Sequence, residues 1–149
     1  MRRTFGVLLV LLSTLGLPTA GSAQTAGGGG SSGQQASGFQ LLQNYPNPFN
    51  PETTIPFVLN EDLFVDGEPV VVSLRIYNIL RQLVAVPVAL KHPAGEGVPL
   101  LSLEYATPGR HEGFWDGKAG NGREVASGVY YAQLTVNGVS KVMKMLVMK

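Results

Sequence analysis

The sequence has no cysteine and few charged residues, and both shortages limit what the protein can do. Without cysteine, the 149-residue chain has no disulfide bond, thiol nucleophile, thiolate metal site or lipid-modified cysteine. Only 14% of the residues are charged, and 11 basic against 10 acidic residues give a formal net charge of +1. So balanced a chain shows no basic excess that would indicate binding to nucleic acid or to an anionic membrane.

Helical periodicity is also missing. Beyond the first 24 residues, no segment repeats apolar residues at the 3.6-residue period of an amphipathic helix. The chain instead contains 19 glycines and 10 prolines. This composition is typical of an extracellular all-β domain with many turns, and it does not favour a helical enzyme.

The chain divides into three regions. Residues 1–23 begin with two arginines, continue with an apolar run and end in small residues, which predicts a secretory signal peptide cleaved after Ala23. The apolar run is shorter than the roughly 20 residues that a membrane-spanning helix needs. Residues 24–38 are rich in glycine and serine and predict a flexible linker. Residues 39–149 form the predicted folded domain.

Short alternations of apolar and polar residues recur through this domain and predict about seven antiparallel strands, with one face of each turned to the core. Asn137 and Gly138 form a two-residue hairpin turn, because both tolerate positive φ. Pro87 has no amide hydrogen, so it predicts an edge strand or a bulge. The pattern indicates an all-β, immunoglobulin-like β-sandwich. The predicted strands are 53–59, 70–78, 83–90, 99–105, 110–116, 128–136 and 139–149.

The loop that begins "WDGKAGNGREVASG" admits two interpretations. It holds four side-chain oxygen donors that could surround a metal ion, or it is a corner where the fold turns. Calcium loops place their oxygens at regular, alternate positions. Here the spacing is irregular, so we favour the corner. The four donors are Asp116, Asn121, Glu124 and Ser127.

If the loop is a corner of the fold, its most unusual residues have structural roles. Trp115 ends a strand and is expected to fill the core between the sheets. Asp116 and Gly117 supply turn geometry, and the Asp116 carboxylate is placed to accept hydrogen bonds from loop amides. Gly128 is expected to adopt an unusual φ, or to allow close backbone approach, before the last hairpin.

No catalytic constellation is visible. The chain has two histidines, His92 and His111, and each stands alone in the sequence. Zinc needs three or four converging ligands, and acid–base catalysis needs a base within reach of its partner. We therefore expect no enzyme, catalytic residue, metal, cofactor or small-molecule substrate.

Two segments near the ends of the domain each have a structural and a functional interpretation. "NYPNPFNPETTIPF" (44–57) contains four prolines and predicts a stiff, extended path with Tyr45 and Phe49 as anchors. It is either a rigid lead-in or a strip that another protein recognises. "KVMKMLVMK" (141–149) is largely apolar on both faces, so it either fills the core or offers an exposed edge to a partner.

Four ordered stretches resemble the type A C-terminal sorting domains of type IX secretion. They are "NYPNPFNPETTIPF", "LRIYNILRQLVAV", "WDGKAGNGREVASGVYY" and "KMLVMK". The same features are shared with the related Ig-like domain of flagellar hook-capping proteins. The resemblance covers about residues 39–149, nearly all of the predicted mature chain.

This resemblance implies a non-enzymatic export signal that a translocon at the outer membrane recognises. The protein would cross the periplasm and end at the cell surface or outside the cell, and its partners would be translocon proteins. The implied recognition residues are Lys144, Met145, Leu146, Val147, Met148 and Lys149. The implied structural residues are Asn47, Pro48, Phe49, Asn50 and Pro51 in the N-terminal strip, Trp115, Asp116 and Gly117 in the loop, and Gly128, Val129 and Tyr130 in the shared strand motif.

Two departures from the family pattern leave alternatives open. Leu80-Arg81-Gln82 stands where the family commonly has Gly-Gln, so a turn that needs positive φ would strain Arg81 by about 1 kcal/mol. In addition, only the linker separates the signal peptide from the domain, with no cargo. The alternatives are an assembly module of the hook-capping kind and a small surface-binding module.

Overall fold

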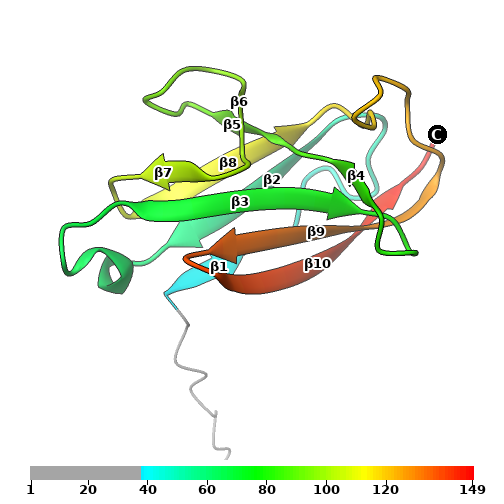
Figure 1. Cartoon of the computed structure of the whole chain (residues 1–149). Coiled ribbons are helices and arrows are strands. Elements are labelled where there is room, and N and C mark those ends of the chain that lie inside the picture. Colours follow the sequence, from blue (N-terminus) through cyan, green and yellow to red (C-terminus); the bar gives the residue numbers. More distant parts are fainter. Residues whose placement is uncertain (1–37) are drawn as a thin grey trace, which may run out of the picture. The chain divides into compact units, whose positions relative to one another are not determined.

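The computed structural model describes residues 38–149, which form two antiparallel β-sheets packed face to face (Figure 1). This confirms the predicted all-β sandwich. The predicted signal peptide and nearly all of the linker lie outside the described residues, although Gly38 is described and is buried. The strands are β1 (Phe39–Leu41), β2 (Thr53–Leu59), β3 (Val70–Tyr77), β4 (Leu83–Ala85), β5 (Val88–Leu90), β6 (Val98–Pro99), β7 (Leu103–Tyr105), β8 (Gly109–Trp115), β9 (Gly128–Val136) and β10 (Val139–Val147).

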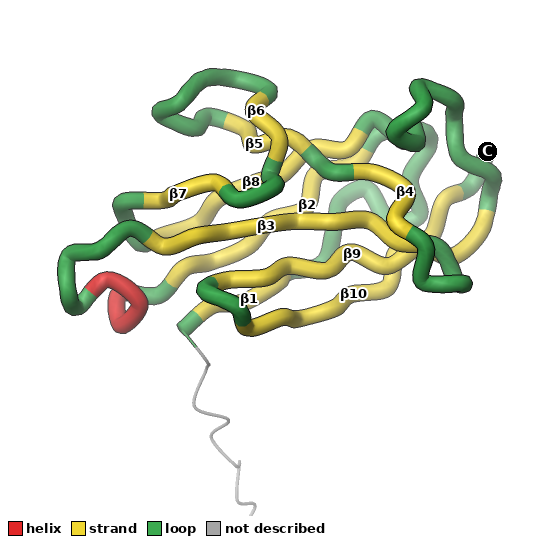
Figure 2. Tube along the Cα trace, in the orientation of Figure 1, coloured by secondary structure: helices red, strands yellow, loops and turns green. Residues whose placement is uncertain are grey.

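The first sheet has the strand order β1-β2-β8-β5-β6, and the second has the order β10-β9-β3-β4, with β7 also paired to β3. Loops and one short 3₁₀ helix, η1 (Glu61–Phe64), make the connections (Figure 2). The described part contains no helix long and apolar enough to span a membrane. Strand β10 comes first in the strand order of the second sheet and therefore lies at an edge of that sheet.

Period-two alternation builds the core, as predicted. In β3, Val70, Val72, Leu74 and Ile76 are completely buried, and in β9 the buried positions again alternate, beginning at Tyr130. The Asn137-Gly138 turn forms as expected, with φ values of 46° and 84°, and it sets Val139 opposite Val136. Burying one large aliphatic side chain contributes about 1.5–3 kcal/mol, so these alternating rows hold the sheets together.

The predicted strand 83–90 divides in two, because the chain changes sheets at Val86-Pro87. Strand β4 pairs with β3 in the second sheet, whereas β5 pairs with β8 in the first. Pro87 has no amide hydrogen to offer either sheet, which suits it to this crossing. The predicted strand 99–105 divides in the same way into β6 and β7. With β1 added, the structure has ten strands among residues 38–149 where about seven are expected.

The proline-rich strip does not follow the predicted extended path. It bends at residues 46–48, and main-chain hydrogen bonds between Tyr45 and Thr54 close it into a loop. The buried Asn44 amide donates to Thr53 Oγ1 at 2.9 Å and to the Pro46 carbonyl at 3.1 Å, which folds the segment back on itself. Of the two predicted anchors, Phe49 is buried, but Tyr45 is 47% exposed.

Candidate recognition surface

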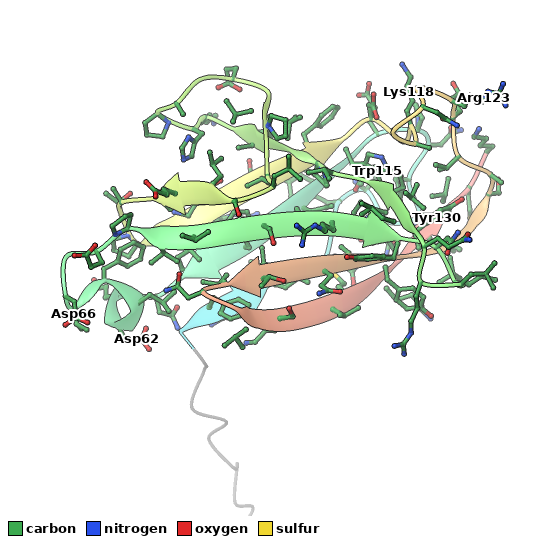
Figure 3. All side chains as sticks on the ribbon, in the orientation of Figure 1. Asp62, Asp66, Trp115, Lys118, Arg123 and Tyr130 are labelled. Carbon is green, nitrogen blue, oxygen red and sulfur yellow. The ribbon has the colours of Figure 1, made fainter. Side chains whose placement is uncertain are left out.

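Three stretches far apart in the sequence meet at one end of the sandwich. They are the strip around residues 44–53, the loop 115–127 and the tail 144–149, and we call their meeting place the motif end. Figure 3 labels Trp115, Lys118, Arg123 and Tyr130 at this end, away from Asp62 and Asp66 at the other. The motif end brings together most of the residues that the sequence marks as important.

Main-chain pairing joins the strip to the tail. The Phe49 amide donates to the Leu146 carbonyl, and the Met148 amide donates to the Phe49 carbonyl, both at 3.0 Å. The Leu146 amide donates to Asn47 Oδ1, also at 3.0 Å. Phe49 and Val147 thus form a short parallel bridge. The strip therefore covers the last part of the β10 edge, from Leu146 to Met148.

An aromatic stack lies beneath this pairing. The ring centroid of Phe49 is 5.3 Å from that of Trp115, and the centroid of Trp115 is 5.7 Å from that of Tyr130, both in edge-to-face geometry. Trp115 Nε1 donates to the Lys118 carbonyl, and the Tyr130 hydroxyl donates to the Ala126 carbonyl. Trp115 therefore fills the core as predicted, and each polar group of the stack has a partner.

Gly117 is needed for the strip to approach the loop. Its φ is +72°, and an added Cβ would lie 2.2 Å from the Pro51 carbonyl oxygen, where ordinary contact begins at 3.4 Å. Gly128 has φ of +149°, as the sequence predicts, although a Cβ there would meet nothing within 4 Å. Gly117 thus serves close packing, whereas Gly128 serves backbone conformation.

The four side-chain oxygens of the loop accept hydrogen bonds from N–H groups of the protein. Asp116 Oδ1 accepts from the Lys118 amide, as predicted, and Asn121 Oδ1 accepts from the Arg123 amide. Both are local turn contacts. Within residues 38–149, no group of three or more His, Asp or Glu side chains is placed to hold a metal ion.

The other two donors hold the last residue of the tail. The Lys149 amide donates to Ser127 Oγ at 3.1 Å, and Lys149 Nζ lies 3.0 Å from Glu124 Oε2. The hydrogen bond from Lys149 lowers the pKa of the Glu124 carboxyl. Sequence reasoning missed the contacts of these two residues with the tail, because 22 and 25 positions separate them from Lys149.

The six tail residues divide between core and surface. Met145 and Val147 are buried at 0% and 1% exposure and complete the core beside the aromatic stack. Lys144, Leu146 and Met148 point outward on the exposed face of β10. Only the outward residues and the loop cations around them are available to a partner.

The remaining strip and strand residues are mostly exposed. Pro48, Asn50 and Pro51 are exposed at the surface of the closed loop, and Val129 is half-buried opposite Leu146. The Tyr45 hydroxyl donates to Glu112 Oε1 at 2.7 Å, which ties the loop to β8 and raises the pKa of Tyr45. The strip is therefore anchored by Phe49 and by hydrogen bonds.

The two histidines that stand alone in the sequence are neighbours in the fold. Their rings pack on Tyr105, with centroid distances of 4.7 Å for His92 and 4.5 Å for His111. Burial raises the pKa of Tyr105 to about 12, and burial, with the nearby His92, lowers the pKa of His111. His92 Nε2 and His111 Nε2 each bond a backbone carbonyl. This packing joins loop 91–97 to β7 and β8.

Comparison with known proteins gives distant structural similarities. No protein-family model matches the sequence, and no curated protein matches it either. The dimeric latent PorU of Porphyromonas gingivalis is similar over 74% of this chain and 9% of its own, with 22% identity and a TM-score of 0.49. PorZ, a surface component of the type IX secretion system of the same bacterium, is similar over 81% of this chain and 13% of its own, with 22% identity and a TM-score of 0.43. The chain thus spans about a tenth of each of these proteins.

Proposed function

We propose that residues 39–149 form a non-enzymatic export signal of the type IX kind, which outer-membrane translocon proteins recognise at the motif end. The observation that carries this proposal is the pairing of the tail with the N-terminal strip. Stretches that resemble the sorting domains, and that lie about 100 residues apart, form one hydrogen-bonded surface. The signal is then a folded shape, in which the tail is one component.

The chemistry of the motif end indicates what it would recognise. Lys144 and Arg123 are exposed cations, and Leu146 and Met148 are 36% and 55% exposed apolar side chains. A binding surface of aliphatic groups with cations around them suits a partner patch that is apolar with acidic groups at its rim. By this proposal the protein reaches the cell surface or the medium through the periplasm, after removal of residues 1–23.

Export itself tests the proposal. In a bacterium with type IX secretion, we expect deletion of 144–149 to leave the chain in the periplasm. That deletion also removes core residues, so a double variant of Lys144 and Met148, both to serine, separates recognition from folding. Both side chains point outward, so the variant should unfold at nearly the wild-type temperature while its export falls several-fold.

A matched control is Val71→Ser. Val71 is 39% exposed on the outer face of the same sheet and pairs with Glu104 on β7, away from the tail. It should be exported normally. Normal export of a stable Lys144/Met148 double variant would contradict recognition through the tail and favour an assembly or surface-binding role.

A further inference from the structure

Strand β10 has an edge that is only partly covered. It is nine residues long and pairs on one side with β9. On its other side, the strip occupies Leu146 and Met148. A long exposed edge with apolar side chains is a template for pairing with another strand.

The alternation of hydrogen bonds along the strand decides which main-chain groups of this edge are free. Bonding alternates along an antiparallel strand, so residues two apart turn their main-chain groups to the same side. Leu146 turns its amide and carbonyl away from β9 toward the strip. Ser140, Val142 and Lys144 therefore also turn theirs outward, and within residues 38–149 these groups have no main-chain partner.

We propose that this free edge pairs with the same edge of a second copy of the chain, antiparallel and with Val142 facing Val142. The free segment begins at the turn residue Gly138 and ends at the strip contact of Leu146, so Val142 is its midpoint. In this register Ser140 lies opposite Lys144 of the partner subunit, and residue 146 lies opposite the partner's turn. The added strand would thus end where the strip begins. Three residue pairs would each exchange two hydrogen bonds: Ser140 with the partner's Lys144, Val142 with the partner's Val142, and Lys144 with the partner's Ser140.

The side chains agree with this register. Val142 is 60% exposed on the outer face, so the two Val142 side chains would meet across the two-fold axis. Lys144 would face a serine, and no cation would lie directly opposite another. Lys141, the other lysine of the segment, points inward and donates to the Phe39 carbonyl at 2.6 Å. Neither lysine therefore blocks the pairing, although lysines commonly protect strand edges.

The contact is short, and its strength follows from its length. The seven residues between Gly138 and Leu146 span about 23 Å of strand, so the interface would lie below the roughly 1,200 Å² of a stable complex. We expect a weak dimer that forms between about 10 µM and about 1 mM protein. This inference goes beyond the proposed function and does not depend on it.

The test measures the mass and the amide exchange of the purified protein across that concentration range. Wild type should move toward twice the monomer mass, and the Ser140, Val142 and Lys144 amides should become protected together. Val142→Pro removes the outward amide hydrogen and leaves the bonds to β9 intact, because Lys141 and Met143 make those. Val142→Lys sets two cations against each other and keeps the backbone unchanged, should the proline disturb folding.

Both Val142 variants should stay monomeric at the highest concentration, whereas the control Val71→Lys, on a central strand of the same outer face, should associate like wild type. The proposal is overturned if wild type remains a monomer near 1 mM with these three amides exchanging freely. It is also overturned if association persists in both Val142 variants, since a different surface must then make the contact.

Discussion

Replacing Gly117 with alanine tests whether the strip and the loop are packed as closely as the motif end requires. Two costs are expected. A non-glycine residue at φ of +72° is strained by about 1–2 kcal/mol, from which the lower entropy of the unfolded alanine variant subtracts about 0.4–1 kcal/mol. In addition, the new Cβ would lie 2.2 Å from the Pro51 oxygen, so the strip must move by more than 1 Å.

Moving the strip disturbs the contacts of Phe49, which is 1% exposed and whose complete truncation would cost about 3–5 kcal/mol. We expect Gly117→Ala to lose about 3–4 kcal/mol in total. For a domain of this size the midpoint of thermal unfolding falls by about 4 °C per kcal/mol, hence by roughly 12 °C or more. Circular dichroism during heating and urea unfolding at 25 °C both measure this loss.

Gly122→Ala is the matched control, because Gly122 has nearly the same φ, +78°, and its Cβ would meet nothing within 4 Å. It should lose only about 1 kcal/mol. Equal losses in the two variants would refute the close packing of strip and loop. A second check combines Gly117→Ala with Phe49→Ala: once the strip has moved, removing Phe49 should cost less than it does in wild type.

Three further predictions concern other features of the fold. Arg81 has φ of +60°, so Arg81→Gly should stabilise the protein by about 0.5–1 kcal/mol in urea unfolding, and a loss would show that the arginine side chain makes a needed contact. The pKa of His111 is lowered in the folded state, so the contribution of this residue to the free energy of unfolding should be full above pH 6.5 and fall as the pH drops toward that lowered pKa. His111→Phe should flatten this pH dependence, and an unchanged slope of the free energy of unfolding against pH would contradict the prediction. Asn47→Ala should speed exchange of the Leu146 amide and cost about 1 kcal/mol, whereas the exposed Asn50→Ala should do neither.

Local signals predicted most of the strands and the last hairpin. Alternation in β3 and β9 identified their buried faces, and the Asn137-Gly138 turn fixed the last hairpin, because side-chain period and turn chemistry act over a few residues. The resemblance left open whether the turn needs positive φ at Arg81, and the structure gives this residue a φ of +60°. In this chain, what depends on neighbours in sequence was predictable.

Features that depend on distant partners were not predictable in this way. The change of sheet at Val86-Pro87 depends on which strands lie on either side. Tyr45 looked like an apolar anchor, but its hydroxyl bonds Glu112, 67 positions away. The two histidines become neighbours because β5 and β8 bring them to the same tyrosine, Tyr105 on β7. The resemblance singled out these stretches of the sequence, whereas only the fold shows that they touch at the motif end.

If the domain is the export signal that we propose, this contact decides how the tail would act in it. If a translocon read 144–149 as a linear sequence, a free peptide of these six residues would compete with the whole protein. In the fold, Met145 and Val147 are buried, the main chain of Leu146 is bonded to the strip, and Lys149 is held by the loop. A free peptide has none of these constraints, and ordering it costs about 1–2 kcal/mol per residue of backbone entropy. We therefore expect the peptide, even at 100-fold excess, not to reduce export of the intact chain from spheroplast-derived vesicles, whereas the folded 39–149 region should reduce it. Competition by the peptide at equal concentration would show that the sequence of the tail, rather than the shape of the motif end, is the signal.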